Sequence, residues 1–320
     1  MKKKKNDSGP VKVSCGLLAG MLAPGVVHAC ACGCGVFDVA TSSMLPNGTG
    51  GMAWLQYDYQ DQNHNWNGSS QGLGVNNGDK EIATHFITAG FQYMFNTSWG
   101  LQLEVPYDYR TFKTVTANPS VPPNTVTTLN WGALGDIRLE GIYTGFFADQ
   151  SAGVTFGVKL PTGDWTYNNA YGDVDRDSEI GSGSTDILLG GFYRGNLDRD
   201  QKWDWFAQGL LDVPVLTQAE YRPGVELDTA AGIDYKGLSL GRARISPVAQ
   251  VIFSERTGDI GYAANPGNSG YQRILLSPGI EFHIHPVKIY ADAEFPVYQN
   301  FTGNQLAAPV LFKLSVSYMF

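Results

Sequence analysis

Three cysteines at alternate positions, Cys30, Cys32 and Cys34, carry the softest ligand atoms in the first part of this 320-residue chain. Thiolates bind Cu(I) or Zn²⁺, and Gly33 and Gly35 would let the backbone wrap closely around an ion. In an oxidising compartment the same thiols form disulfides, and a cysteine at a newly cut N-terminus can carry a lipid. The spacing therefore leaves a soft-metal site, a disulfide and a lipid anchor open.

A second candidate site is the acidic stretch 172–186, with the sequence GDVDRDSEIGSGSTD. Asp173, Asp175, Asp177 and Glu179 alternate, so an extended backbone would present all four carboxylates on one side. Carboxylate oxygens are the ligands that Ca²⁺ prefers. The spacing differs from the known calcium-loop motif and a basic residue lies inside it, so a solvated acidic loop is the alternative.

No catalytic set is evident elsewhere. His283 and His285 form a lone pair near an expected turn, and nothing suggests a Ser–His–acid arrangement with them. No Cys-x-x-Cys-His motif for haem attachment occurs, and no basic cluster suited to nucleic acid lies beyond the N-terminus. We predict that the chain is not an enzyme, binds no nucleic acid, and holds no cofactor apart from a metal ion at either of the two candidate sites above.

The composition indicates the kind of element that must position these residues. Charged residues make up 16% of the chain, and it has 39 glycines and 12% aromatic residues; soluble proteins have about 25% charged residues. Apart from the N-terminus there is no apolar run of the roughly 20 residues that a transmembrane helix needs. Together these features predict an all-β protein.

The N-terminus is typical of a secretory signal peptide. Lysines at 2–5 and 12 precede the apolar run 13–27, and Ala29 ends a short cleavage-type sequence. We predict a signal peptide over 1–29, followed by a Cys/Gly-rich segment, 30–50, that serves as a plug or a lipid anchor.

From about residue 51 the chain alternates apolar and polar residues in segments of ten or more, which is typical of a transmembrane β-barrel. In 310–320 every even-numbered residue is apolar or aromatic, while Lys313, Ser315 and Ser317 lie on the opposite face. Segments 100–110 and 288–297 show the same alternation. One face therefore suits lipid and the other suits a polar lumen.

The connections between these segments alternate between long and short, as in outer-membrane barrels with long outer loops and short periplasmic turns. We predict a transmembrane antiparallel β-barrel of about twelve strands over 51–320, with both termini on the periplasmic side. The expected strands are 51–62, 82–95, 98–115, 128–145, 151–161, 182–195, 202–216, 223–236, 240–255, 270–284, 286–298 and 307–320.

The lumen is the third candidate site. Strand parity points these charged residues inward: Asp58, Glu104, Asp108, Arg110, Asp136, Arg138, Glu140, Lys159, Asp186, Asp204, Asp228, Asp234, Arg242, Arg244, Glu281, Asp292, Glu294 and Lys313. Both signs are interleaved, which favours a salt-bridged interior over a pore of a single sign. The pairs are either structural or substrate ligands. An apolar inner patch is expected from Trp54, Phe86, Leu134, Phe206, Leu210 and Leu275.

Aromatic residues near the ends of the expected strands and at the end of the chain indicate which membrane the barrel occupies. Tyr, Trp and Phe near strand ends suit the aromatic girdles of a barrel, and Tyr318 and Phe320 resemble the signal read by the barrel-assembly machinery. We therefore predict the Gram-negative outer membrane, with its lipid, its lipopolysaccharide and that machinery as partners.

Three short motifs resemble a known family. Gly135-Asp136-Ile137-Arg138 is followed by Leu-Pro-Thr-Gly-Asp at 160–164 and by Gly-Ser-Gly-Ser-Thr-Asp at 181–186. This order resembles the outer-membrane proteins grouped as the "meta-pathway of phenol degradation" family, which are encoded with aromatic-compound catabolism and regarded as transporters. The resemblance implies a role in uptake.

We therefore expect an outer-membrane channel or transporter for small molecules, hydrophobic or aromatic ones included. The alternative is a structural or electron-conduit barrel that sheathes or docks a periplasmic or surface partner. The substrate itself is not identified by the sequence.

Overall fold

The computed structural model describes residues 45–46, 48–116, 122, 124–169 and 172–320. The predicted signal peptide and Cys30, Cys32 and Cys34 lie outside them. Among the described residues, no helix has the length and apolar character needed to cross a membrane.

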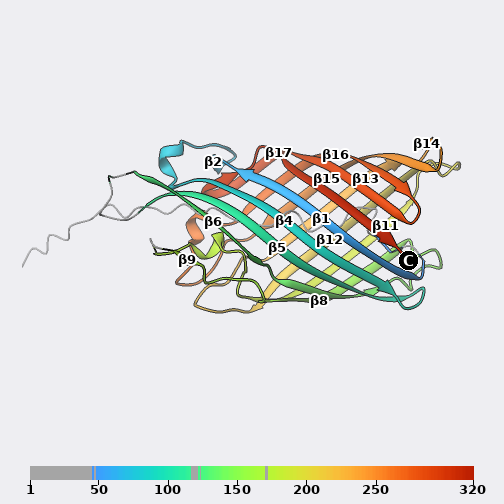
Figure 1. Cartoon of the computed structure of the whole chain (residues 1–320), viewed down its shortest axis with the longest axis horizontal. Coiled ribbons are helices and arrows are strands. Elements are labelled where there is room, and N and C mark those ends of the chain that lie inside the picture. Colours follow the sequence, from blue (N-terminus) through green and yellow to red (C-terminus); the bar gives the residue numbers. More distant parts are fainter. Residues whose placement is uncertain (1–44, 47, 117–121, 123, 170–171) are drawn as a thin grey trace, which may run out of the picture.

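The strands form a closed antiparallel barrel with twelve positions in its wall, as predicted (Figure 1). Each strand pairs with the next, and the last strand pairs with the first, for example Asp58 opposite Lys313. In order the wall strands are β1 (Gly50–Gln62), β4 (Asp79–Met94), β5 (Trp99–Val115), β6 (Val126–Leu134) continued by β7 (Ile137–Tyr143), β8 (Ala152–Leu160), β11 (Thr185–Asn196), β12 (Trp203–Leu216), β13 (Glu226–Tyr235), β15 (Ala243–Arg256), β16 (Tyr271–Ile284), β17 (Val287–Ala307) and β18 (Leu311–Met319).

Shorter elements lie in the connections. They are β2 (His64–Gly68), β3 (Ser70–Gln71), β9 (Asn168–Asn169), β10 (Gly172–Asp173), β14 (Leu238–Leu240) and the 3-10 turns η2 (Gly74–Asn76), η3 (Arg176–Ser178) and η4 (Pro266–Asn268).

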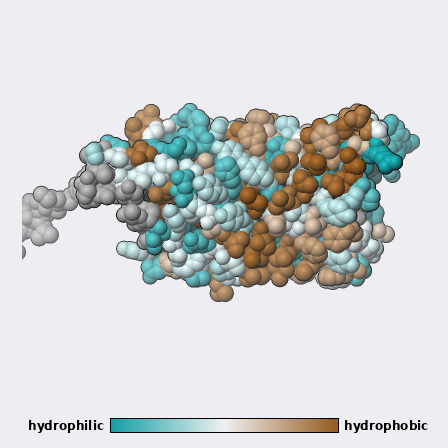
Figure 2. Space-filling model, in the orientation of Figure 1, coloured by the Kyte–Doolittle hydropathy of each residue, from teal (hydrophilic) through white to brown (hydrophobic). Residues whose placement is uncertain are grey.

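The predicted inside–outside alternation is confirmed. In β18, Leu314 and Val316 are 44% and 43% exposed on the outer face, whereas Ser315 and Ser317 are 2% and 4% exposed on the inner face. On the face that Figure 2 shows, hydrophobic residues gather over the half of the barrel away from the long loops. A closed barrel satisfies its backbone hydrogen bonds internally, and an apolar outer band suits lipid.

The two ends of the barrel differ. At the turn end, short connections such as 95–98 and 285–286 join the strands. β1 begins and β18 ends there. Gly51 and Phe320 exchange two backbone hydrogen bonds of 2.8 and 2.9 Å at this end. Tyr318 and Phe320 are 52% and 58% exposed, and their role as an assembly signal stays a prediction. The loop end carries the longer connections, including 161–184 and 257–270.

Two strand predictions were wrong in their bounds. The expected strand 128–145 is broken at 135–136, where β6 ends and β7 begins. The expected loop 299–306 belongs instead to β17, which has 21 residues. The C-terminal part of β17 pairs with β2. The hairpin of β2 and β3, which lies in the connection after β1, therefore supplies the hydrogen bonds that extend β17.

Candidate functional site

The lumen holds nearly all of the charged residues that strand parity pointed inward. Asp58 and Arg110 are each 1% exposed, and Lys313 is 4% exposed with its Nζ 3.9 Å from Glu294 Oε1. The others that are buried or line a lumen cavity are Glu104, Asp108, Asp136, Arg138, Glu140, Lys159, Asp186, Asp204, Asp228, Asp234, Arg244, Glu281, Asp292 and Glu294.

Two inward predictions were wrong. Arg242 is exposed because it lies in the turn that precedes β15, outside the alternating part of the strand. Leu134 is 52% exposed on the outer face, directly before the break between β6 and β7. Of the other residues of the expected apolar patch, Trp54, Phe86, Phe206 and Leu275 are buried and Leu210 is half-buried. Trp54, Phe206 and Leu275 belong to three different apolar clusters.

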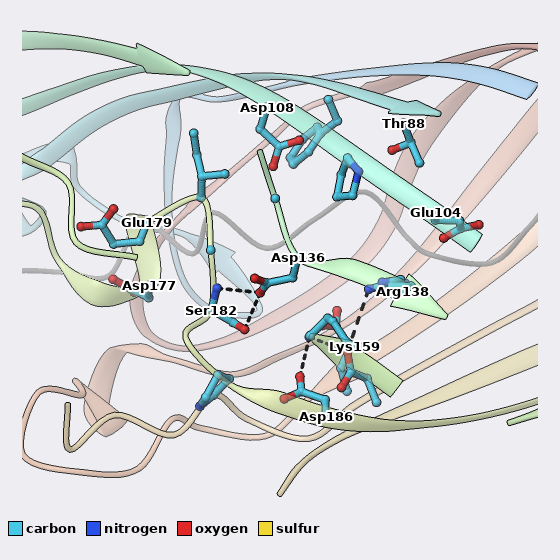
Figure 3. A pocket seen from close by; sticks show the side chains of 18 of the residues that line it. Thr88, Glu104, Asp108, Asp136, Arg138, Lys159, Asp177, Glu179, Ser182 and Asp186 are labelled. Atoms are coloured by element: carbon cyan, nitrogen blue, oxygen red, sulfur yellow. Dashed lines mark hydrogen bonds and ion pairs between the residues drawn. The ribbon is translucent and has the colours of Figure 1, made fainter. Parts of the chain in front are cut away.

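A cavity of about 200 Å³ lies in the lumen towards the loop end (Figure 3). Wall strands from β1 round to β15 contribute to it, and the connection 161–184 between β8 and β11 folds inward over it. Its charged lining consists of nine acidic and four basic residues: Asp58, Glu104, Asp108, Asp136, Asp177, Glu179, Asp186, Asp212, Glu226, Arg138, Lys159, Arg176 and Arg256.

Asp136 fastens the inward connection to the barrel wall. Its Oδ1 accepts a hydrogen bond from the backbone N–H of Gly163 at 2.9 Å, and its Oδ2 accepts from the backbone N–H and the Oγ–H of Ser182 at 2.8 and 2.6 Å (Figure 3). The strand breaks at 135–136 where this side chain is engaged. A Cβ at Gly163 would lie 2.7 Å from Cα of Gly181, so the two segments approach too closely for a larger residue. The three motifs of the sequence thus meet at one point.

Two arginines hold the same connection from other sides. The Nη1 of Arg110 donates to the backbone carbonyls of Ser178 and Glu179 at 2.6 and 3.0 Å. Arg176 lies over the rings of Trp165 and Tyr221, with its guanidinium carbon 4.6 and 4.9 Å from their centroids. The connection 161–184 thus forms a roof over the cavity, and contacts to the wall and to a second loop determine its position.

A buried ion-pair network lies on the wall below this roof. The Nζ of Lys159 is 2.5 Å from Asp186 Oδ2 and 2.6 Å from Asp212 Oδ2, and Arg138 approaches Asp212 at 3.9 Å (Figure 3). Asp212 was missed among the inward residues. The period of two along β12, which pointed Asp204 inward, places Asp212 on the same face and would have found it.

An apolar cluster closes the lumen beside the roof. Trp131 and Tyr167 stack with ring centroids 4.7 Å apart and planes 7° apart. They belong to a cluster with Ile82, Phe112, Leu129, Val174, Ile180 and Leu306. Because β6, the strand that carries Trp131, pairs with β5 alone among the described strands, the roof packs where a second neighbour would lie.

The predicted calcium ligands are not brought to one place. Asp177 and Glu179 line the cavity, Asp175 is exposed, and the side chain of Asp173 lies outside the described part. Within the described ranges no three His, Cys, Asp or Glu side chains are arranged to hold a metal ion. Burial raises the pKa of Asp177 to about 7 and that of Glu179 to about 8. The calcium site stays a prediction.

A smaller cavity of about 80 Å³ lies towards the turn end. Its charged lining has three acidic and four basic residues: Asp204, Asp234, Glu281, Arg194, Lys236, Arg244 and Lys288. Leu45, from the segment before β1, packs there against Phe206, and Arg194 donates to the carbonyl of Pro46 at 2.6 Å. Leu45 and Pro46 are thus buried in the lumen, whereas Gly48 and Thr49 are exposed, and the role of 30–50 as a plug stays a prediction.

No family model and no curated protein matches this chain. The solved structures that are similar to it in fold include two outer-membrane barrels. The COG4313 outer membrane channel from Pseudomonas putida F1 is 11% identical, with 88% of this chain and 100% of that chain covered and a TM-score of 0.62. The β domain of the Bordetella autotransporter BrkA is also 11% identical, with 85% and 100% covered and a TM-score of 0.52. At this identity the similarity extends to the barrel fold alone.

Proposed function

We propose that this chain is a channel of the Gram-negative outer membrane through which small molecules pass, with the loop end facing the cell exterior. The observation that carries the proposal is the cavity of about 200 Å³ in the lumen of a barrel whose outer face is apolar. Short turns on one side and long loops on the other are how outer-membrane barrels are oriented.

The size of the cavity sets the scale of the solute. An engineered apolar cavity of about 150 Å³ binds benzene, so about 200 Å³ accommodates one ring with a small substituent. Phe86, Ile180 and Tyr221 supply apolar and aromatic surface to the lining. These residues support passage of single-ring aromatic molecules among the small solutes.

The occupied lumen favours a channel over a barrel that sheathes a partner. A sheath needs a lumen wide enough for another polypeptide. Here the connection 161–184 lies across the lumen at the loop end, and Leu45 packs inside it at the turn end. A small solute needs only local movement of these two segments.

The proposal is tested by reconstituting the refolded chain in planar bilayers and in liposomes. We expect discrete conductance steps in KCl, and swelling of liposomes in a five-carbon sugar but not in a trisaccharide. The heat-denatured chain serves as the control for lipid leakage. Electrically silent bilayers together with liposomes that fail to swell would contradict the proposed function.

A further inference from the structure

The lining of the loop-end cavity is strongly unbalanced in charge. Nine carboxyl groups face four basic side chains. The basic groups have close partners of their own: Lys159 lies between Asp186 and Asp212, Arg176 lies over two aromatic rings, and Arg256 is 2.6 Å from Asp259. A cleft lined with an excess of one sign raises the local concentration of the opposite ion about 10- to 1000-fold.

Glu179 is one of several carboxyl groups in this lining with a buried oxygen that no hydrogen bond of the described structure satisfies, and Asp177 and Asp212 are others. Glu179 is 6% exposed, and its Oε2 is buried without a hydrogen-bond partner among the described residues. Arg110 holds the carbonyl of the same residue, so the side chain is set at the cavity wall by its backbone. A buried acceptor without a donor is unfavourable, and the N–H of a ligand entering the cavity would remove that cost.

The raised pKa of Glu179 is consistent with a ligand that carries a positive charge. Burial raises the pKa of its carboxyl group to about 8. A backbone hydrogen bond from Tyr167 opposes this effect, Asp164 adds to it, and Arg176 and Arg110 oppose it. A positive charge placed beside a carboxyl group favours its ionised form. A cation in the cavity would therefore convert Glu179 into its charge partner.

The apolar part of the lining determines the rest of the ligand. Phe86, Ile180 and Tyr221 lie in the same cavity as Glu179, and its volume of about 200 Å³ exceeds the roughly 150 Å³ that holds benzene. We propose that this cavity selects small organic cations, and single-ring ammonium compounds above all, over anions of the same size, with Glu179 accepting a hydrogen bond from the ammonium group. The inference rests on the proposed channel function and specifies its substrate class.

The test compares three single-ring probes of nearly equal size on the reconstituted channel at pH 8: benzylamine, which is largely protonated, benzyl alcohol and benzoate. We expect a reversal potential of cation-selective sign in a KCl gradient. We also expect benzylammonium to block the current at about one tenth or less of the concentration that benzoate needs. Benzyl alcohol should fall between them.

The variant Glu179→Gln removes the carboxylate and keeps the shape of the side chain. It should raise the half-blocking concentration of benzylammonium about tenfold and leave that of benzyl alcohol unchanged. Glu220→Gln is the matched control, because Glu220 is an exposed glutamate in another connection of the loop end and does not line the cavity. Its block should equal that of the unmodified chain.

The outcomes separate this inference from the proposed function. Equal block by benzylammonium and benzoate in a conducting channel overturns the inference alone, as does an E179Q block that matches E220Q. A chain that carries no current overturns the channel and the inference together. The comparison of the three probes needs no variant, so it decides the matter even where E179Q fails to fold.

Discussion

The two cavities of the lumen lie in the same barrel but have opposite charge balance. The one at the loop end has nine acidic and four basic residues in its lining, and the one at the turn end has three acidic and four basic residues. The loop-end cavity is roofed by an inward connection, whereas the turn-end cavity is closed by Leu45 and the backbone of Pro46. The comparison shows that a lumen with both signs of charge can still divide into regions of different selectivity.

The largest expected effect contrasts a lysine from each region. Lys159→Met leaves Asp186, which is fully buried, and Asp212 without their shared cation. Breaking a buried pair in this way costs about 3–5 kcal/mol in the free energy of unfolding. Lys236→Met at the turn end removes the cationic partner of Asp204 and leaves its hydrogen bond from Asn196. The lysine side chain is 35% exposed, so we expect at most about 1 kcal/mol.

Urea-induced unfolding of both variants in lipid vesicles, followed by tryptophan fluorescence, measures the two losses. Equal losses would mean that the ion pairs of the two regions are equally solvated, and the contrast between the cavities would then be wrong.

A smaller effect is expected where the roof is fastened. Asp136→Asn retains only one acceptor oxygen and places an amide N–H₂ where the Ser182 N–H now donates. Hydrogen bonds to charged groups contribute about 1.5–3 kcal/mol, and we expect a loss in that range. The roof should loosen, so the single-channel conductance should rise and the connection 161–184 should become sensitive to protease.

Asp164→Asn is the control for this prediction. The side chain of Asp164 accepts hydrogen bonds from Thr166 within the same connection, whereas its backbone hydrogen bonds to Leu134 and Gly181 are retained in the variant. A change in conductance of the same size in both variants would show that Asp136 does not determine the position of the roof.

The smallest effect concerns pH. The folded chain raises the pKa of Glu179 to about 8, above the usual 4.5, because the side chain is buried. The stability that its protonated form contributes is fully present below pH 4.5 and is lost as the pH rises through 8. Asp164, Arg176 and Arg110 are the charged groups that act on it.

Between pH 5 and pH 8 the full shift would correspond to about 3 kcal/mol. Because solvent in the cavity screens the charge, we expect the free energy of unfolding to fall by on the order of 1 kcal/mol more in the unmodified chain than in E179Q. Unfolding curves of both at the two pH values measure the difference. Parallel behaviour of the two chains would show that Glu179 is not protonated by burial, which would weaken the contrast between the two cavities.

The strand pattern was predictable because it is a local property. Side chains alternate with a period of two along any extended segment, so the inner and outer faces of β5 and β18 follow from residues that are neighbours in the chain. Where the alternation stopped, the prediction failed, as at Arg242 in the turn before β15. The extent of β17 could not be predicted, since its last residues are strand only because β2 lies beside them.

By itself, the sequence determined a β-barrel of twelve strands, its apolar outer face and a lumen with charges of both signs. Only the tertiary structure decided how those charges are distributed. The break at Asp136 depends on donors from Gly163 and Ser182, and the roof brings Glu179 to a wall that distant strands build. The alternation along a strand determines whether a side chain points inward or outward. The charge of a cavity depends on which strands and loops meet around it. Contacts between segments far apart in the chain determine that arrangement.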